Sequence, residues 1–293
     1  MKNFFFYLIL FSSLISTGQT QQNINKNSGT SSNVIATIDS IRFNSSSTTM
    51  EVVLQNGTVE SHSIADIINV NFISVNQSQH SCGANNVHNP AKTYGTMTDQ
   101  QGNVYKTIVI GAQEWMAENL KTTIYRNGNA IANITDNAQW DGLTTGAWAS
   151  YNNDSQNDCP YGKLYNWYAV ADPGHVCPMG WHVPTDDEWT TLTDYLGGAA
   201  AAAGGKMKTT GLQYWISPNT DATNESGFSG LPGGYRYYFN GDFNDVGDYG
   251  YWWSSSEYDA NNAWSRFLFY DFGNAYQGYG SKQGGFSVRC LRD

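Results

Sequence analysis

The sequence predicts an α+β fold, in which a few helices pack against an antiparallel sheet rich in aromatic residues. The 293 residues include 10 Trp, 19 Tyr, 13 Phe and 30 Gly, a composition that favours many short strands joined by turns over a helical bundle. Strand patterns open the main part of the chain and return after the helices, so we expect the two ends of that domain to come together. The best-marked helix lies between them, over 186–196.

Both ends of the helix at 186–196 are marked by its residues. Thr185 at the N-cap and Glu188 at N3 form a capping box, and Gly197 is typical of the C′ position that ends a helix. Four apolar side chains share one face at helical spacing, so the helix is expected to cover a large surface such as a sheet. They are Trp189, Leu192, Tyr195 and Leu196.

The other elements of the main domain follow from local patterns. The first are two strands around a turn at Gln101-Gly102, a helical turn over 115–120, a helix within 161–170, and a helix-forming alanine run at 199–203. Four sheet strands are expected after them, at 227–238, 249–258, 263–272 and 285–293. In the last strand, alternation places Phe286, Val288 and Cys290 on one face.

Residues 1–18 have the features of a secretory signal peptide. Lys2 supplies the positive charge, an apolar core too short to span a bilayer follows, and small residues allow cleavage before Gln19. No later segment of the sequence is apolar enough over a sufficient length to cross a membrane. We therefore expect a secreted or cell-surface protein, exported through this signal peptide.

The chain between the signal peptide and the main domain divides by composition. The polar residues 19–33 are expected to be a disordered linker. Residues 34–75 alternate between apolar and polar residues on both sides of Asn56-Gly57, a hairpin signal, and predict a small all-β module. A second linker over 76–92 then leads to the main domain over 93–293.

Export changes how the four cysteines are interpreted. An even number of cysteines in an oxidising compartment suggests two disulfides, and three pairings are possible. We favour Cys177–Cys290, which would tie the start of the helix to the last strand, together with Cys82–Cys159. The sequence has no C-x-x-C or paired-histidine spacing, so no metal site is predicted from these residues.

The charge balance narrows the class of partner. The formal net charge is −10, and basic residues form no cluster along the chain. Neutralising the phosphates of a nucleic acid requires such a cluster. We therefore do not expect a nucleic-acid partner.

Several blocks of the main domain occur in a recognisable order. They are GNVYKTIVIGAQEWMAENL, YGKLYNWYAV, CPMGWHVPTDDEWTTL, GGKMKTTG, NESGFSGLPGGYR, GYWWSSSEY and GFSVRCLRD, within 94–293. Together they resemble the Fibrobacter succinogenes major paralogous domain family. The resemblance implies an exported or surface protein with a C-type-lectin-like fold, which also serves formylglycine-generating enzymes. It implies no particular activity, because a fold alone does not fix a function.

No catalytic residues are predicted. The stretch GFSGL lacks the final glycine of the G-x-S-x-G nucleophile motif, because Leu231 occupies that position. The five histidines are scattered, and His182 is interpreted as a structural turn residue. A formylglycine-generating enzyme needs reactive cysteines, whereas Cys177 and Cys290 are better explained as a disulfide.

Calcium is the cofactor that the sequence leaves open. Ca²⁺ takes several oxygen ligands, and GDFNDVGD supplies Asp242, Asn244, Asp245 and Asp248 close together. This stretch resembles the start of an EF-hand loop, but Val246 occupies the third ligand position, and no E-P-N or Q-P-D motif is present. We interpret these residues as Asx-rich turns, with a calcium site as the alternative.

Aromatic residues are too dense over 235–280 for all of them to enter one core. Alternation over 263–272 places Arg266 and Leu268 on one face and Phe267 and Phe269 on the other. Exposed Tyr and Trp rings flanked by Asn, Asp and Ser suit sugar stacking or protein recognition. The residues expected to contact the ligand are Tyr258, Asn261, Asn262, Trp264, Tyr270, Asn274, Tyr276 and Tyr279.

These residues predict a secreted or cell-surface binding or adhesion module that recognises a glycan or a surface protein. One alternative is a structural protein of the cell envelope without a discrete ligand. A second alternative is an enzyme of the formylglycine-generating type.

Overall fold

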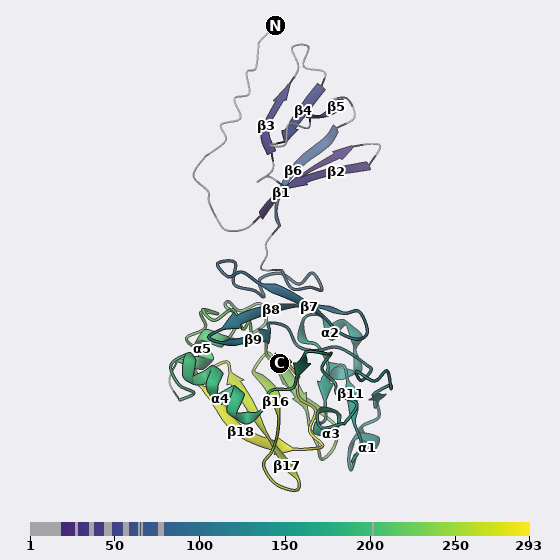
Figure 1. Cartoon of the computed structure of the whole chain (residues 1–293), viewed down its shortest axis with the longest axis vertical. Helices are drawn as coiled ribbons and strands as arrows, with labels where there is room; N and C mark the ends of the chain where they lie inside the picture. Colours follow the sequence, from purple (N-terminus) through teal and green to yellow (C-terminus); the bar gives the residue numbers. More distant parts are fainter. Residues whose placement is uncertain are drawn as a thin grey trace. The chain divides into compact units, whose positions relative to one another are not determined.

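The structure is a computed structural model of the whole chain. It describes residues 19–26, 29–34, 38–43, 49–54, 59–63, 65, 67–75, 79–200 and 202–293. The chain divides into two compact units, Met1–Gln77 and Ser78–Asp293, each considered by itself (Figure 1). The expected signal peptide over 1–18 lies outside the described residues. Within the described residues, no helix is long and apolar enough to cross a membrane.

The first unit contains two three-stranded sheets, of order β2-β1-β6 and β3-β4-β5. The strands are β1 (Gln19–Lys26), β2 (Gly29–Val34), β3 (Ile38–Phe43), β4 (Thr49–Leu54), β5 (Val59–Ser63) and β6 (Ile67–Val75). β4 and β5 pair antiparallel, as the hairpin prediction requires. The Asn56-Gly57 turn between them lies outside the described residues.

The structure differs from the disordered linker expected over 19–33. Its described residues form β1 and β2, and β1 pairs antiparallel with β2 on one side and with β6 on the other. The polar side chains of β1 provide no apolar pattern that would predict a strand. Its backbone N–H and C=O groups are nevertheless satisfied by both neighbours, and this pairing decides its conformation.

In the second unit, the first strands and the last strand meet in one five-stranded sheet of order β13-β19-β9-β8-β7. The strands are β7 (Gly95–Thr98), β8 (Val104–Ile110), β9 (Gln113–Met116), β13 (Trp181–His182) and β19 (Leu291–Arg292). The prediction that the domain ends come together is therefore confirmed. The helical turn expected over 115–120 is wrong, because Trp115 and Met116 lie in β9, where Trp115 pairs with Leu291, and residues 117–120 form no helix.

A second five-stranded sheet carries most of the aromatic residues and has the order β15-β14-β16-β17-β18. The strands are β14 (Gly233–Arg236), β15 (Phe243–Val246), β16 (Tyr249–Glu257), β17 (Asn262–Phe269) and β18 (Ala275–Ser281). β16, β17 and β18 are antiparallel neighbours, whereas β14 runs parallel to β16. A small sheet contains β10 (Ala132–Asn133), β11 (Ala147–Ala149) and β12 (Leu164–Tyr165). The second unit is therefore a mixed α+β domain.

The segment 285–293 is not the regular strand that the alternation predicts. Only its end forms β19, while Phe286 and Ser287 make isolated bridges to neighbouring segments. Residues 285–291 are all buried, so the segment runs through the interior of the unit. Alternation between a buried and an exposed face therefore does not apply to it.

The helices are short. They are α1 (Asn137–Trp140), α2 (Asp158–Tyr161), α3 (Trp167–Val170), α4 (Asp186–Tyr195) and α5 (Ala203–Met207), with 3-10 turns at Tyr151–Asn153 and Ser155–Asn157. The single helix expected within 161–170 is instead split into β12 and α3. Asn166 separates the two, because its side chain caps the start of α3.

α4 confirms the helix predicted from its capping box. Thr185 Oγ1 accepts from the backbone N–H of Glu188, and the Glu188 carboxylate accepts from the backbone N–H of Thr185. The predicted apolar stripe is buried except for Tyr195, whose side chain is 66% exposed. The buried face of α4 is therefore narrower than the sequence indicates.

α4 lies over one face of the second sheet (Figure 1). A layer of aromatic rings fills the space between them. The ring centroid of Phe228 lies 5.8 Å from that of Trp189 on α4 and 5.8 Å from that of Trp252 on β16. An ion pair joins the same surfaces, because Arg266 Nη1 on β17 donates to Asp186 Oδ1 over 2.5 Å. Burying each of these rings contributes roughly 2–3 kcal/mol, so this face of the sheet is firmly closed.

Both favoured disulfides are confirmed, and no cysteine is free. Cys177–Cys290 ties the segment before α4 to the terminal segment across a sequence separation of 113 residues. In the chain-entropy model, a loop of this length stabilises the fold by about 4–5 kcal/mol. The two disulfides are consistent with an extracytoplasmic location.

α5 does not lie in the alanine run that the sequence favours. It begins at Ala203 and contains both Gly204 and Gly205, which are poor helix formers. The glycines are needed because a Cβ on Gly204 would lie 2.0 Å from the carbonyl oxygen of Asn274, and one on Gly205 would lie 2.3 Å from that of Asp221. Close backbone packing, rather than helix propensity, therefore sets the position of α5.

We predict that Gly204→Ala lowers the stability of the fold, although alanine is favoured over glycine in a helix by about 1 kcal/mol. The added Cβ must push α5 away from Asn274, and overpacking of this kind costs about 1–3 kcal/mol. Thermal unfolding of the full chain measures the effect. Thr191→Ala, on the exposed surface of α4, is the control and should cause no comparable loss. A Gly204→Ala variant more stable than the wild type would contradict the close packing.

Candidate ligand-binding site

A cavity of about 540 Å³ opens on the face of the second sheet that α4 leaves uncovered. Its volume lies within the usual range for small-molecule sites, roughly 300–1,000 Å³. Most of its wall is aromatic, and two asparagines stand at its edge. These lining residues are Tyr235, Tyr237, Tyr238, Tyr251, Phe267, Tyr279, Phe286, Asn261 and Asn262.

Strand alternation explains which side chains face the cavity. On β17, Arg266 points to the α4 side, so Phe267 points to the opposite face, as the sequence predicts. On β16, Tyr251 pairs in register with Phe267, and their ring centroids are 5.0 Å apart. Tyr235 and Phe286 complete the wall, each with its ring centroid 5.0 Å from that of Tyr251.

Two glycines of β18 leave room for these rings. A Cβ on Gly278 would lie 2.4 Å from Cε2 of Phe267, and a Cβ on Gly280 would lie 2.8 Å from Cε2 of Phe286. Larger residues at these positions would force the rings to move. The shape of the aromatic wall therefore depends on close approach to the β18 backbone.

The described residues that line the cavity offer no accessible charge. Arg236 is the one charged residue among them, and its side chain is fully buried. Its guanidinium donates to the backbone carbonyl oxygens of Gly241 and Ile134 and so turns away from a ligand. Burial raises the pKa of Tyr235 and Tyr251, which keeps both hydroxyls neutral. The wall thus presents rings, hydroxyls and amides without net charge.

Three of the predicted ligand residues form an aromatic triad at the same end of the sheet but on its α4 side, because Trp264 and its cross-strand partner Tyr279 share a face of β17 and β18 with Arg266. Tyr258 stacks on Tyr279 with ring centroids 4.1 Å apart and planes at 3°, and Trp264 meets Tyr258 edge-on at 4.8 Å. Tyr258 is 45% exposed and Tyr279 is 53% exposed. Tyr279, Asn261 and Asn262 also line the cavity. The structure therefore brings five of the eight predicted residues to one end of the β16–β17 hairpin.

Tyr270, Asn274 and Tyr276 lie elsewhere, and Tyr258 and Trp264 do not line the cavity either. Tyr270 packs partly against the core beneath α4. Asn274 donates through Nδ2 to the carbonyl oxygen of Ala200, near α5. Tyr276 lies on the open face of β18, with its ring centroid 4.7 Å from that of Phe269.

Sequence reasoning missed Tyr251, Phe267 and Phe286 as site residues. A usable signal was present, because Tyr251 and Phe267 fall on the strand face opposite the fully buried Trp252 and Arg266. What the sequence did not show is that Phe286 reaches this face from the interior terminal segment.

The part of the chain that contains the cavity matches a known protein family. Residues 108–292 match the model of the Fibrobacter succinogenes major domain (Fib_succ_major). The chain belongs to the Fibrobacter succinogenes major domain family. The match includes α4, the whole second sheet and every residue that lines the cavity. No curated protein and no solved structure matches the sequence.

In this Fibrobacter succinogenes major domain, the calcium candidates are held by turn contacts around β15. The Asp242 carboxylate accepts from the side-chain amides of Asn137 and Asn240, and the Tyr251 hydroxyl faces Asp245 at 3.4 Å. Asn244 donates to the Asp242 carbonyl oxygen, and Asp248 follows β15. Among the described residues, these carboxylates do not form a group of three with oxygens within 4.8 Å of one another.

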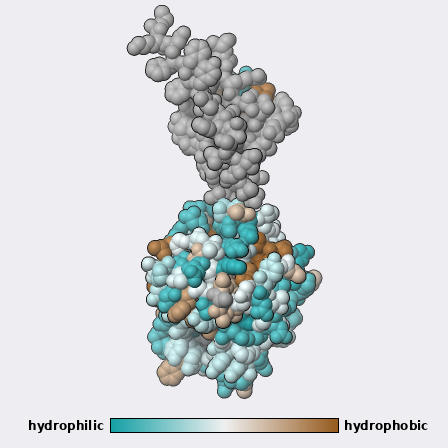
Figure 2. All heavy atoms as spheres, turned by 90° about the vertical axis from the view of Figure 1, so that its left-hand side faces the viewer, coloured by the Kyte–Doolittle hydropathy of each residue, from teal (hydrophilic) through white to brown (hydrophobic). Residues whose placement is uncertain are grey.

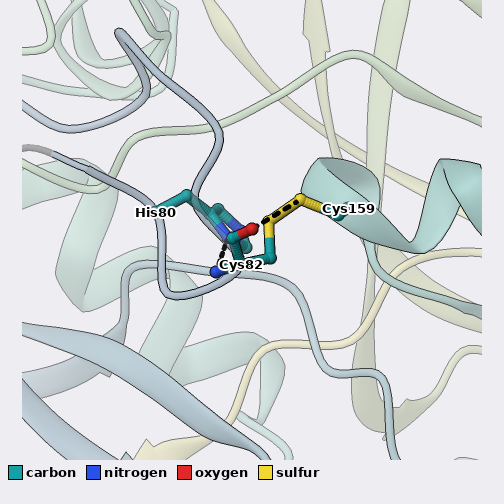
Figure 3. Close-up of side chains that lie close together, drawn as sticks. All are labelled: His80, Cys82 and Cys159. Atoms are coloured by element: carbon teal, nitrogen blue, oxygen red, sulfur yellow. Dashed lines mark hydrogen bonds between the residues drawn. A yellow bond between two sulfur atoms is a disulfide. The ribbon is translucent and has the colours of Figure 1, made fainter. Parts of the chain in front are cut away.

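The described part of the chain does bring one group of possible metal ligands together, His80, Cys82 and Cys159, within 4.8 Å (Figure 3). The two sulfurs are joined in a disulfide, so neither is a thiolate that could bind a metal ion. His80 Nδ1 accepts from the backbone N–H of Cys82 over 3.1 Å. The group is therefore a structural crosslink in this oxidised state.

The segment expected as a linker over 76–92 is built into the second unit from Ser78 onward. His88 Nε2 lies 3.0 Å from Glu118 Oε1, and His88 Nδ1 lies 3.1 Å from Ser229 Oγ. The side chains of His88 and Glu118 are fully buried. Ser81 donates to the same carboxylate through its backbone N–H and its hydroxyl. These contacts join residues distant in sequence, so no local pattern predicts them.

Burial shifts the pKa values of the cluster formed by His80, His88 and Glu118. Desolvation lowers the pKa of His80 to about 4 and also lowers the pKa of His88, so both rings are neutral at pH 7. Burial alone would raise the pKa of Glu118. The hydrogen bonds from His88 and Ser81, together with the nearby imidazoles, outweigh burial and lower this pKa to about 2.

We predict that acid destabilises the domain through this cluster. In the unfolded chain His80 takes up a proton near pH 6.5, whereas in the folded chain it does so near pH 4. The unfolded state therefore binds more protons in this window, and stability is lost as the pH falls from 6.5 toward 4. The loss from His80 is roughly 3 kcal/mol. Glu118 adds a further loss between pH 4.5 and 2.

Thermal unfolding between pH 8 and pH 4 tests this prediction. His80→Asn is the matched variant, because its Oδ1 takes the place of Nδ1 and its side chain does not titrate. Its unfolding temperature should fall less between pH 6.5 and pH 4 than that of the wild type. Equal falls in the two proteins would show that His80 is not the group responsible.

Proposed function

We propose that this domain is a secreted or cell-surface binding module for an uncharged glycan. The observation that carries the proposal is the composition of the 540 Å³ cavity, which combines aromatic rings, tyrosine hydroxyls and asparagine amides without an accessible charge. An anionic or cationic ligand would find no counter-charge in this wall. A neutral ligand with both apolar and hydroxyl-bearing faces matches it.

Each kind of group in the cavity suits a sugar ring. Aromatic faces pack against the C–H side of a pyranose, while hydroxyl and amide groups exchange hydrogen bonds with its hydroxyls. Asn261 is exposed, and its side chain makes no hydrogen bond within the described part of the chain, so both of its amide atoms are available. Asn262 binds Asp259 through Nδ2, which fixes the orientation of its amide.

A surface protein is the alternative ligand. Protein interfaces of ordinary size bury about 800 Å² per partner around a well-packed apolar centre. On the face of the second unit seen in Figure 2, hydrophobic residues occur in separate patches among hydrophilic ones. The cavity, in contrast, concentrates its aromatic residues in a concave site, which favours a small or narrow ligand.

The proposal includes a C-type-lectin-like fold for the second unit. The family membership supports it, and so does the meeting of the first strands and the last strand in one sheet. In this reading, α4 and the Cys177–Cys290 disulfide form the framework, and the open face of the second sheet binds the ligand. The disulfides support export to an oxidising compartment.

The alternatives have less support. A formylglycine-generating enzyme requires a reactive thiol, and all four cysteines of the chain are paired in disulfides. A purely structural role in the cell envelope would not explain a cavity lined by seven aromatic side chains. Binding therefore accounts for more of the structure than either alternative.

We predict that the full chain binds neutral glycans on an array and that Tyr237→Ala and Tyr279→Ala weaken binding to the strongest array ligand at least about tenfold, or 1.4 kcal/mol. Calorimetric titration measures the change. Phe239→Ala is the control, because Phe239 is 68% exposed and does not line the cavity. Failure of the folded chain to bind any glycan, or an equal loss in the control, would contradict the proposal.

A further inference from the structure

The aromatic wall of the cavity continues along the open face of the second sheet. On this face, Tyr249 of β16 pairs in register with Phe269 of β17, two residues from the Tyr251–Phe267 pair. The ring centroids of Tyr249 and Phe269 are 4.7 Å apart. Each of these four rings is only partly buried, so the rings remain in contact with solvent.

A second aromatic cluster lies at the far end of this row. Tyr276 of β18 and Phe272 approach Phe269 with ring centroids at 4.7 Å and 6.3 Å. Phe272 is 48% exposed, and neither residue lines the cavity. The Tyr249–Phe269–Tyr276 cluster is therefore a separate aromatic surface, connected to the cavity through Phe267.

The length of the row exceeds that of one sugar ring. β17 runs from Asn262 at the cavity to Phe269 at the second cluster. Seven steps along a strand span about 23 Å at roughly 3.3 Å per residue. Neighbouring rings are inclined to one another, with 64° between Tyr251 and Phe267 and 73° between Tyr249 and Phe269, so the surface that they form is not a flat plate.

We infer that the ligand is a linear, uncharged polysaccharide, which occupies the cavity with one stretch and the Tyr249–Phe269–Tyr276 cluster with another. This inference rests on the proposed function and extends it to the class of glycan. An aromatic surface that continues past the cavity along β16 and β17 can contact successive units in the interior of a linear chain, whereas the cavity alone would contact only one stretch of it.

The charges beside the second cluster favour a neutral chain over an anionic one. Tyr249 lies within electrostatic reach of Asp245, Asp248 and Asp271, which together with burial raise its pKa. A polymer of uronic acids or sulfated sugars would be repelled by these carboxylates. The hydroxyls of a neutral sugar can instead donate to them.

The test is the dependence of affinity on ligand length. Linear β-1,4-linked gluco-, xylo- and manno-oligosaccharides, from dimers to octamers, are titrated into the full chain. For the series that binds, affinity should rise with length until both aromatic surfaces are filled and then level off. Polygalacturonate should not bind. An affinity equal for dimer and octamer would overturn this inference while leaving the proposed function in place. Binding of polygalacturonate would overturn both, because both require an uncharged glycan.

Two variants locate the second surface. Tyr276→Ala and Phe272→Ala should weaken octamer binding about tenfold and leave dimer and trimer binding within twofold. Tyr195→Ala on the opposite, α4 side is the matched control and should change neither. Unfolding temperatures check that each variant is folded, and the exposed Phe272 provides a second probe if Tyr276→Ala fails to fold. Loss of short and long ligands alike, or of neither, would overturn the inference. The proposed function itself would fail if no neutral oligosaccharide bound the wild type.

Discussion

The interior path of the terminal segment 285–291 is the constraint on which the second unit depends. Its carbonyl oxygens at Val288 and Cys290 accept from the backbone N–H groups of Leu120 and Met116, so it is paired although it is not a strand. At its centre, the fully buried Arg289 lies over the ring of Phe228 and donates to the carbonyl oxygen of that residue. Burial lowers the pKa of Arg289 to about 9, which still leaves it charged at pH 7. A buried charge with unpaired donors would cost several kcal/mol, so this segment and its acceptors must be in place together.

The shape of the proposed binding surface follows from this path. Phe286 enters from the terminal segment, stacks on Trp253 at 4.2 Å between ring centroids, and reaches Tyr251 at 5.0 Å. The open face of the second sheet is therefore covered only partly, whereas α4 buries Trp252 and Leu268 on the opposite face. Aromatic rings that elsewhere would lie in a core are left half-buried here. The Cys177–Cys290 disulfide links the two sides of this arrangement, since it joins the entry to α4 with the segment that carries Phe286.

The sequence predicts what depends on neighbours along the chain. The capping box of α4, the alternation of β17 and the family membership were all available from local patterns. Export and an even cysteine count indicated two disulfides, and the pairing was favoured among three because Cys177–Cys290 would tie the helix to the last strand. Prediction from the sequence fails where contacts between distant segments determine the local conformation. α5 is placed by the backbones of Asn274 and Asp221, and β1 by pairing with β6. The cavity needs Phe286 beside Tyr251, a contact that no periodicity reveals. Tyr270 and Asn274 were chosen for their residue type, although alternation along 263–272 places Tyr270 on the same face as Arg266, where it packs against the core beneath α4.

We propose that an uncharged glycan binds to the open face of the second sheet. The most direct measurement is an NMR titration of the full chain, in which the tyrosine rings carry an isotopic label. A neutral linear oligosaccharide that binds the chain is added stepwise, and the ring signals are followed. We expect the ring signals of Tyr235 and Tyr251 to shift and that of Tyr195, on the α4 side, to stay unchanged. Shifts confined to Tyr195, or none at the cavity while the oligosaccharide is bound, would contradict the proposal.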